Sequence, residues 1–259
     1  MSFSMRYNGN DLSDILRIHK VEGRGPFLQE ITRKSISGRD GSLRTKRRLP
    51  ERILNVHFKF LVSGLEGMRE RIDELNRRLY TDNAVPIIFS DEPDVTYFGE
   101  YAGEPDWEEK IVQGQGAIPF VCYDPYKYGD EVTNKITVPG DPDATIVTLF
   151  AGQASGAEYN ISSVSTQPIF DVTFSDSAKE YSIKHRESVR ELKVIYDFRR
   201  GDKLTLDATL RRVKINNEVK MPTLTMSSAW FDLRSGNNNF EVSPEGNAET
   251  KVTYRPRWL

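Results

Sequence analysis

Three histidines, His19, His57 and His185, are the residues of this 259-residue chain best suited to acid–base catalysis or metal binding. A metal site needs several ligands at characteristic spacings, and a catalytic histidine needs a nucleophile and an orienting acid beside it. The three histidines lie in separate segments, without a His-x-x-x-His, Cys-x-x-Cys or His-Glu-x-x-His motif. We therefore assign no catalytic, metal-ligating or cofactor-binding residue, and expect His57 to be a surface or interface residue.

Acidic residues could support two further kinds of chemistry, and the sequence favours neither. Residues 90–94 and 140–143 combine Asp with Pro, as turns do, and lack the D-x-D-x-D-G ligand order of a calcium loop. Paired carboxylates can hydrolyse glycosidic bonds, but among 38 acidic residues such pairs arise by chance. A wall-degrading enzyme is therefore a weaker hypothesis than a structural protein or a carbohydrate-binding protein.

A basic run that contains Arg44, Lys46, Arg47 and Arg48 is the strongest local concentration of charge. Clustered cations can bind the phosphates of a nucleic acid. No aromatic residues interleave with them to stack on bases, so a solvated hairpin or a salt-bridging surface between subunits is favoured. The role of this run stays open at this point.

Aromatic side chains could form a platform for a sugar or a protein interface. Packing in a core or an interface is the more frequent use of such residues. The candidates are Tyr97, Phe98, Tyr101 and Trp107 in the first half of the chain, and Trp230 with Phe231 in the second.

The composition is that of a globular protein, with 29% charged residues, 37% hydrophobic residues and a net charge of −2. These values exclude a strongly basic nucleic-acid binder and a disordered chain. Cys122 is the single cysteine, so no intrachain disulfide can form, and we expect it to be buried. The N-terminus lacks a signal-peptide pattern, and no stretch has the roughly 20 apolar residues of a membrane span. We expect neither export by a signal peptide nor membrane insertion.

Periodicity predicts strands and one helix in the first half. Residues 53–63 alternate so that one face is wholly apolar, as in a half-buried strand. Residues 65–80 carry an apolar stripe at helical spacing, and Glu74 with Arg78 and Asp73 with Arg77 are spaced as ion pairs. A glycine-punctuated basic excursion near residues 38–50 predicts a projecting hairpin or arm. The other predicted strands are residues 27–37, 85–89, 95–101, 107–113 and 117–123.

The second half has the short, evenly spaced strands of a β-sandwich. We expect a boundary between residues 124 and 134, where Pro, Gly and charged residues interrupt the strand periodicity. Gly201-Asp202 and Gly236-Asn237 are interpreted as turns. The predicted strands are residues 145–150, 157–164, 169–174, 181–185, 192–198, 203–207, 210–215, 240–242 and 251–254. The prediction is a mainly β protein with one helix, divided into domains at residues 1–130 and 131–259.

The order and spacing of four short elements resemble those of the siphophage distal tail protein family. The elements are residues 37–41, residues 120–126, Gly201-Asp202 and Gly236-Asn237. The matching positions are Gly38, Asp40, Gly41, Pro125, Gly201, Asp202, Gly236 and Asn237. The resemblance gives all of these positions architectural roles. It also implies a ring-forming N-terminal domain like that of a tail tube, a C-terminal galectin-like β-sandwich, and no enzymatic activity.

The resemblance further implies a structural hub of the phage tail tip, built as a homo-hexameric ring around a channel. The implied partners are the major tail tube protein, a tail-associated adhesion or lysin protein and the tape measure protein, while DNA passes without specific recognition. Stacking of rings stays open. The implied location is the virion tail tip, after assembly in the bacterial host cytoplasm. The alternative hypothesis is a carbohydrate-binding adhesion module of the baseplate that binds the host surface, with Trp230 as its first test.

Overall fold

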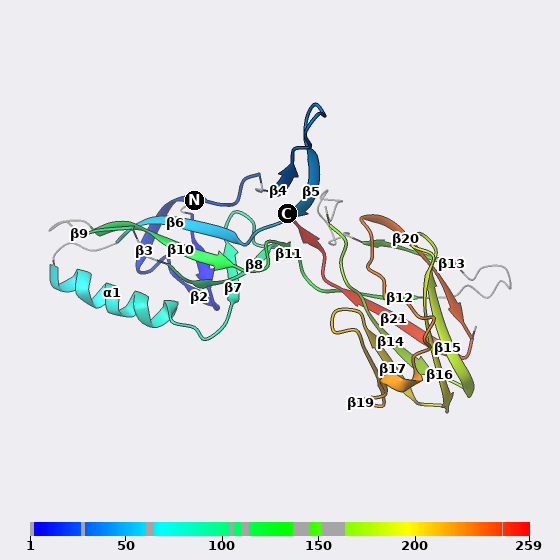
Figure 1. The fold of residues 1–259 in the computed structure, drawn as a ribbon. Coiled ribbons are helices and arrows are strands. Elements are labelled where there is room, and N and C mark those ends of the chain that lie inside the picture. The colour runs from blue at the N-terminus through cyan, green and yellow to red at the C-terminus, as the bar shows by residue number, and fades with distance from the viewer. Residues whose placement is uncertain are drawn as a thin grey trace. The chain divides into compact units, whose positions relative to one another are not determined.

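The computed structural model describes residues 3–26, 29–60, 65–103, 106–109, 114–136, 146–151, 164–244 and 246–259. Contacts within the chain divide it into two compact units, Met1–Tyr128 with Leu259, and Gly129–Trp258. Strands dominate both units, and the described residues contain one α-helix (Figure 1). The predicted fold class, mainly β with one helix, is confirmed.

The first unit is an antiparallel β-sheet with the helix α1 (Leu65–Leu79) packed against it. The strands follow the order β2-β1-β7-β8-β10-β6-β3, while β9 pairs with β10 and β11 pairs with β8. The strands of this unit are β1 (Met5–Tyr7), β2 (Asn10–Asp11), β3 (Leu16–Glu22), β4 (Glu30–Lys34), β5 (Leu43–Arg48), β6 (Arg52–Phe60), β7 (Val85–Phe89), β8 (Thr96–Tyr101), β9 (Asp106–Glu109), β10 (Gly114–Cys122) and β11 (Lys127–Tyr128).

Two periodicities build the core of this unit. On β6, Leu54 and Phe58 are buried while Lys59 is exposed, because alternate residues of a strand point to opposite faces. On α1, Met68 and Leu75 are buried in the same cluster. The predicted apolar strand face and helical stripe are confirmed, and the helix ends one residue before the predicted end. Residues 61–63 and 110–113 of the predicted strands lie outside the described residues.

One predicted ion pair of the helix is present and the other is replaced. Arg78 Nε donates to Glu74 Oε1 over 2.8 Å, as the i,i+4 spacing predicts. Arg77 donates to the second oxygen of Glu74 over 2.5 Å, so the predicted pair with Asp73 is wrong. The i,i+3 neighbour is equally close on a helix, and Glu74 thereby serves both arginines.

The second unit is a sandwich of two antiparallel sheets. The sheets have the orders β12-β21-β14-β17-β18-β19 and β13-β20-β15-β16. Their inner faces share one core, to which β14 contributes Phe170, Val172 and Phe174 and β16 contributes Leu192 and Val194. The elements are β12 (Val132–Ile136), β13 (Ile146–Ala151), β14 (Ile169–Phe174), β15 (Ala178–His185), β16 (Arg190–Phe198), β17 (Lys203–Asp207), β18 (Arg212–Ile215), β19 (Glu218–Val219), a 3-10 helix (Met221–Thr223), β20 (Gly236–Ser243), β21 (Ala248–Tyr254) and β22 (Arg257–Trp258).

Some boundaries in this unit differ from the prediction. Gly236 and Asn237, predicted as a turn, begin strand β20, because β13 extends far enough to pair with both of them. Leu210 lies in the turn before β18, since Arg211 adopts a positive φ of 49°. Strand β12 begins inside the interruption predicted for residues 124–134. Residues 157–163, predicted as a strand, lie outside the described residues.

Candidate assembly site: an exposed arm and two sheet edges

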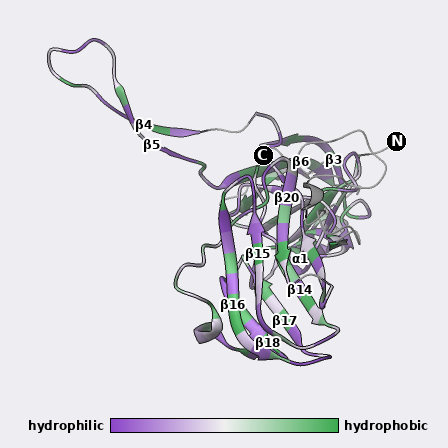
Figure 2. Ribbon diagram, turned by 90° about the vertical axis from the view of Figure 1, so that its right-hand side faces the viewer, coloured by the Kyte–Doolittle hydropathy of each residue, from purple (hydrophilic) through white to green (hydrophobic). Residues whose placement is uncertain are grey.

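Strands β4 and β5 form a separate two-stranded ribbon, which we call the arm (residues 30–48). They pair with each other and with no other described strand, and every residue of both strands is exposed (Figure 2). The predicted projecting hairpin is therefore confirmed. A lone two-stranded ribbon has little apolar surface to bury and is marginally stable in water. A surface that covered the arm would therefore stabilise it.

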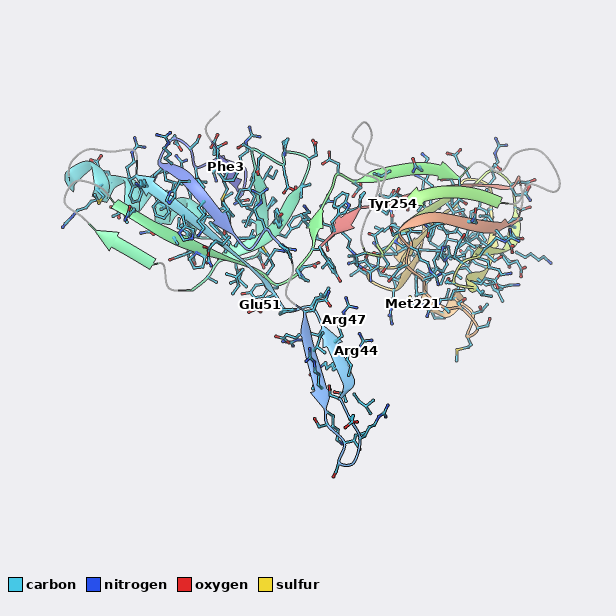
Figure 3. All side chains as sticks on the ribbon, turned by 90° about the horizontal axis from the view of Figure 1, so that it is seen from above. Phe3, Arg44, Arg47, Glu51, Met221 and Tyr254 are labelled. Atoms are coloured by element: carbon cyan, nitrogen blue, oxygen red, sulfur yellow. The ribbon has the colours of Figure 1, made fainter. Side chains whose placement is uncertain are left out.

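The arm is strongly cationic. Its sequence holds seven Lys or Arg residues and two acidic residues. Glu30 neutralises one cation, since Arg48 Nε donates to it over 2.8 Å. Arg33 lies directly opposite Arg44 in the ladder, and like charges in that position destabilise a strand pair. Figure 3 shows Arg44 and Arg47 along β5, whose only paired neighbour among the described strands is β4.

Three branched aliphatic residues of the arm are also exposed. Ile31, Ile36 and Leu43 have 40%, 42% and 40% of their surface accessible. Ile36 and Leu43 belong to the loop end of the ribbon and Ile31 to its other end, so apolar surface is available along the arm. Exposed apolar surface of this kind favours contact with a protein when it is gathered in a patch. A phosphate backbone would neutralise the cations and leave these side chains in water. The combination favours a protein surface as the partner of the arm.

Strands β3 and β9 form opposite edges of the sheet in the order β9-β10-β6-β3. The outer side of β3 is free of strand pairing among the described residues. It carries exposed Arg17 and Lys20, and Arg17 lies opposite exposed Lys59 of β6. Strand β9 holds Asp106, Glu108 and Glu109 at register positions opposite residues 117, 115 and 114 of β10. The two edges therefore carry opposite charges.

Two histidines belong to the cationic edge. The rings of His19 and His57 lie 6.2 Å apart. Partial burial, followed by repulsion from Lys59, His57 and Lys20, holds the pKa of His19 below its ordinary value of 6.5. His57 is a half-buried residue of the outward strand face, with Nε2 3.5 Å from Glu22 Oε1. Its predicted surface position is confirmed, and positive charges accumulate at this edge.

His185 lies in the second unit and is completely buried. Its Nδ1 is 2.8 Å from Ser188 Oγ, while its Nε2 is 3.0 Å from Asn238 Oδ1 and 3.0 Å from Glu187 Oε2. The ring stacks on Phe231 with a centroid distance of 5.2 Å.

This arrangement contains the residue types of a serine hydrolase triad, but its contacts are structural. Glu187 accepts hydrogen bonds from the backbone and the side chain of Asn239, which ties the turn after β15 to β20. Burial lowers the pKa of His185, although Asn238 and Glu187 oppose the shift. The neutral, enclosed imidazole joins strands and leaves no face for a substrate. Sequence spacing gave no sign of this cluster, because Asn238, which accepts or donates at the second ring nitrogen of His185, comes from a distant strand.

The other candidates serve packing. Tyr97 is fully buried, Phe98 packs edge-on against Tyr128 at 5.7 Å, and Tyr101 packs against the core of the first unit. Trp230 packs against the sandwich core, beside the buried Phe231. The packing interpretation of these aromatic residues is confirmed; the side chain of Trp107 lies outside the described residues.

The single cysteine and the acidic loops have structural roles as well. Cys122 is buried, as expected, and burial raises the pKa of its thiol to about 12. In the loop after β7, Asp91 and Glu92 bind the guanidinium of Arg24 over 2.9 and 2.8 Å. The part of the chain that the structure describes holds no cluster of His, Cys, Asp or Glu suited to a metal ion. Residues 140–143 lie outside that part. None of the described helices is long and apolar enough to cross a membrane.

Two family models and several known proteins match the chain. The model of the phage tail protein RIFT-related domain covers residues 11–122, and that of the siphovirus-type tail component, C-terminal domain, covers residues 161–258. The distal tail protein of Bacillus phage SPP1 is 35% identical over 92% of this chain and 90% of its own length. The chain belongs to the distal tail protein family of siphophages.

One solved structure of a tail protein agrees with this family. The crystal structure of SPP1 Dit, described as a paradigm of the hub adsorption apparatus in phages that infect Gram-positive bacteria, has a TM-score of 0.86 and 29% identity, with full coverage of both chains. A baseplate structure of phage P2 matches with a TM-score of 0.48, 9% identity and 97% coverage of each chain. The distal tail protein fold predicted from the sequence is confirmed.

Sequence reasoning found the arm, but missed the edge residues and the apolar residues of the arm. The arm was signalled by Gly38 and Gly41, both with positive φ, around a run of cations. The β3 edge is interrupted by a bulge between Ile18 and Lys20, so its alternation breaks after a few residues. The edges become visible only when the sheet order is known.

Proposed function

We propose that this distal tail protein is a non-enzymatic structural hub of the phage tail tip, which assembles into a homo-hexameric ring through its first unit. The observation that carries the proposal is the pair of oppositely charged sheet edges, β3 and β9, together with an arm that lacks a covering surface. The hub role rests on the family and on the SPP1 relative, described as a hub of the adsorption apparatus.

The two edges favour head-to-tail contact between copies. An edge strand offers unpaired backbone groups to another chain, and a cationic edge attracts an acidic one. Because β3 and β9 are different surfaces, their contact is heterologous and closes into a ring when the rotation between copies permits. Arg17 and Lys59, which repel each other within one copy, then gain anionic neighbours.

The arm adds a second contact between the same copies. Its exposed Ile31 and Leu43 lie on opposite strands, toward opposite ends of the ribbon, and become buried when the arm lies along an adjacent copy. Its cations then reach acidic side chains of that copy. Burial of the aliphatic groups supplies the larger share of the free energy, since exposed ion pairs contribute little.

We further propose the partners and the domain roles. Residues 1–130 form the ring around a channel for the tape measure protein and later the DNA, and residues 131–259 form a galectin-like domain on the outside. The ring joins the major tail tube protein to the tail-associated adhesion or lysin protein, in a virion assembled in the host cytoplasm. The relative's described role as an adsorption hub supports this placement.

Electron microscopy of the purified full chain tests the ring. We expect sixfold rings for the wild type and their loss in the double variant Arg17→Glu, Lys59→Glu, since repulsion then replaces attraction at the β3–β9 contact. Both residues are exposed, so the variant should keep the folded state.

A matched control reverses two cations of the sandwich, Lys214→Glu with Lys251→Glu, and should keep the rings. A wild type that stays monomeric at high concentration, also with its tail partners present, would refute the ring. Rings that survive the Arg17 and Lys59 reversals would show that other surfaces make the contact.

A further inference from the structure

A hollow of about 840 Å³ opens at one end of the sandwich. It lies where β15 begins, β16 ends and the turns beside β17 and β18 meet. Its volume falls within the range of small-molecule sites. The lining residues are Lys179, Ile195, Tyr196, Asp197, Arg199, Asp202 and Asn216.

One side of the hollow is rigid. Asp202 accepts hydrogen bonds from the backbone N–H of Arg199 over 2.8 Å and from Asn216 Nδ2 over 2.9 Å. Asn216 Oδ1 in turn accepts from the backbone N–H of Lys203 over 2.9 Å. Gly201, with a φ of +89°, makes this tight turn possible. The predicted Gly201-Asp202 turn is confirmed, and it also forms a wall of the hollow.

The rest of the lining offers unused binding groups. Among the described residues, the side chains of Lys179, Asp197 and Arg199 and the hydroxyl of Tyr196 make no hydrogen bond or ion pair with another side chain. Lys179 lies opposite a β-bulge of β16, where two residues, Tyr196 and Asp197, stand between the partners of Ala178 and Glu180; such a bulge redirects the side chains of its strand. The hollow therefore combines fixed walls with free donors and acceptors.

Apolar surface lies beside these groups. Ile195 is 57% exposed, and the half-buried ring of Tyr196 is held by Phe198, whose centroid lies 5.1 Å away. A half-buried aromatic ring presents an apolar body together with a polar hydroxyl. A ligand for this hollow has an apolar face and several hydroxyl groups, and the two cations, Lys179 and Arg199, can bind an anionic group of the ligand beside the carboxylates of Asp197 and Asp202.

We propose that this hollow binds a pyranose sugar that carries a phosphate or carboxylate group, as a unit of an anionic surface polysaccharide. Ile195 and Tyr196 receive the C–H face of the ring, and Asp197 accepts from its hydroxyls. Lys179 and Arg199 bind the anionic group through charge-assisted hydrogen bonds. This binding is a property of the second unit and adds host-surface recognition to the proposed hub role.

An acidic peptide is the competing ligand, and the structure favours the sugar. Peptides commonly bind by extending a sheet edge. The edge of β16 is already occupied: Thr225 N–H donates to Lys193 O over 2.9 Å, and Ala229 N–H donates to Glu191 O over 2.8 Å. A compact ring needs no such ladder and fits a hollow at the end of the sandwich.

Saturation-transfer NMR on the full chain tests the site with three probes: glucose 6-phosphate, glucose and a tetraglutamate peptide. We expect transfer to glucose 6-phosphate, weaker transfer to glucose and none to the peptide. The double variant Lys179→Ala, Arg199→Ala should bind the sugar phosphate about tenfold more weakly. The single variant Tyr196→Phe keeps the packing of the ring and loses only the hydroxyl. Its affinity for the sugar phosphate should fall by a smaller factor than that of the double variant.

The double variant Lys214→Ala, Lys251→Ala removes the same charge from the other sheet and should bind like the wild type. Absence of transfer to either sugar, equal binding by the Lys179 and Arg199 variant, or transfer to the peptide alone would overturn the proposal. Micrographs of the same samples report ring formation separately, so failure here is distinguishable from failure of the hub assignment.

Discussion

Strands β3 and β16 are both the last strands of their sheets, but only the outer edge of β16 is covered by another segment of the described chain. The edge of β16 is covered by residues 224–229, which donate backbone hydrogen bonds to it and place Ser228 Oγ 2.9 Å from Lys193 N. The edge of β3 has no such cover among the described residues and carries the exposed cations Arg17 and Lys20, of which Lys20 pairs with Glu22 of the same strand.

The open edge of β3 suits the first unit to assembly with other copies, whereas the covered edge of β16 in the second unit does not. A covered edge prevents association, whereas an open charged edge selects its partner. In the second unit the chain satisfies its own β16 edge, so that edge needs no contact with another copy. In the first unit, both the β3 edge and the arm keep their binding groups available, which is why we place ring formation in that unit.

Replacing the exposed aliphatic residues and cations of the arm should have the largest effect on ring formation. The variant Ile31→Ser, Leu43→Ser, Arg44→Glu, Arg47→Glu changes only exposed residues. We expect loss of the ring in mass photometry, with the free energy of unfolding changed by about 0.5 kcal/mol or less per site. Rings of wild-type stability in this variant would leave the edges as the sole contact.

Replacing the buried His185 should destabilise the second unit and leave the stability of the first unit unchanged. His185→Ala removes a stacked ring and leaves the buried Asn238 side chain without one of its partners, which should cost about 3 kcal/mol. Calorimetry should show the sandwich melting earlier while the first unit is unchanged. The control Ser188→Ala, at a half-buried position, should cost about 1 kcal/mol. Equal shifts in both transitions would contradict independent units.

Acid should weaken the second unit through the same histidine. Burial holds the folded-state pKa of His185 below its ordinary value of 6.5, so between these two values the unfolded chain binds a proton and the folded chain does not. The contribution of neutral His185 to the free energy of unfolding is therefore complete above pH 6.5, and it falls as the pH decreases toward the pKa of the folded state. Chemical denaturation at several pH values checks this, and His185→Gln should remove that dependence.

The sequence predicted elements with strong local periodicity and missed those defined by pairing. Leu54, Val56 and Phe58 alternate without interruption, and Met68, Ile72 and Leu75 follow a helical stripe, so burial could be inferred from spacing alone. Asn237 was misjudged because Asn usually marks a turn, whereas pairing with β13 holds it in a strand. Tertiary pairing here overrode local preference.

The candidate sites show the same limit. The arm could be predicted because glycines and a basic run are contiguous in sequence. The opposite charges of the two edges could not, since Arg17 and Glu108 are related only through the sheet order. The hollow joins Lys179 to Asn216 across three turns, and its free groups are evident only once their neighbours are known.

The smallest expected effect is the coupling free energy of an exposed ion pair in the first unit, compared with that of a buried hydrogen bond in the second. In the first unit, both terminal nitrogens of Arg78 on α1 bind Asp14 over 2.9 Å, and this hydrogen-bonded pair holds the pKa of Asp14 below its ordinary value. The side chains are 21% and 54% exposed, so a double-mutant cycle with Arg78→Ala and Asp14→Ala should give a coupling of about 0.5–1 kcal/mol. Salt should screen this coupling. The His185–Asn238 coupling, buried in the sandwich, should keep its value at the same ionic strength, and equal salt sensitivity of both cycles would refute this difference.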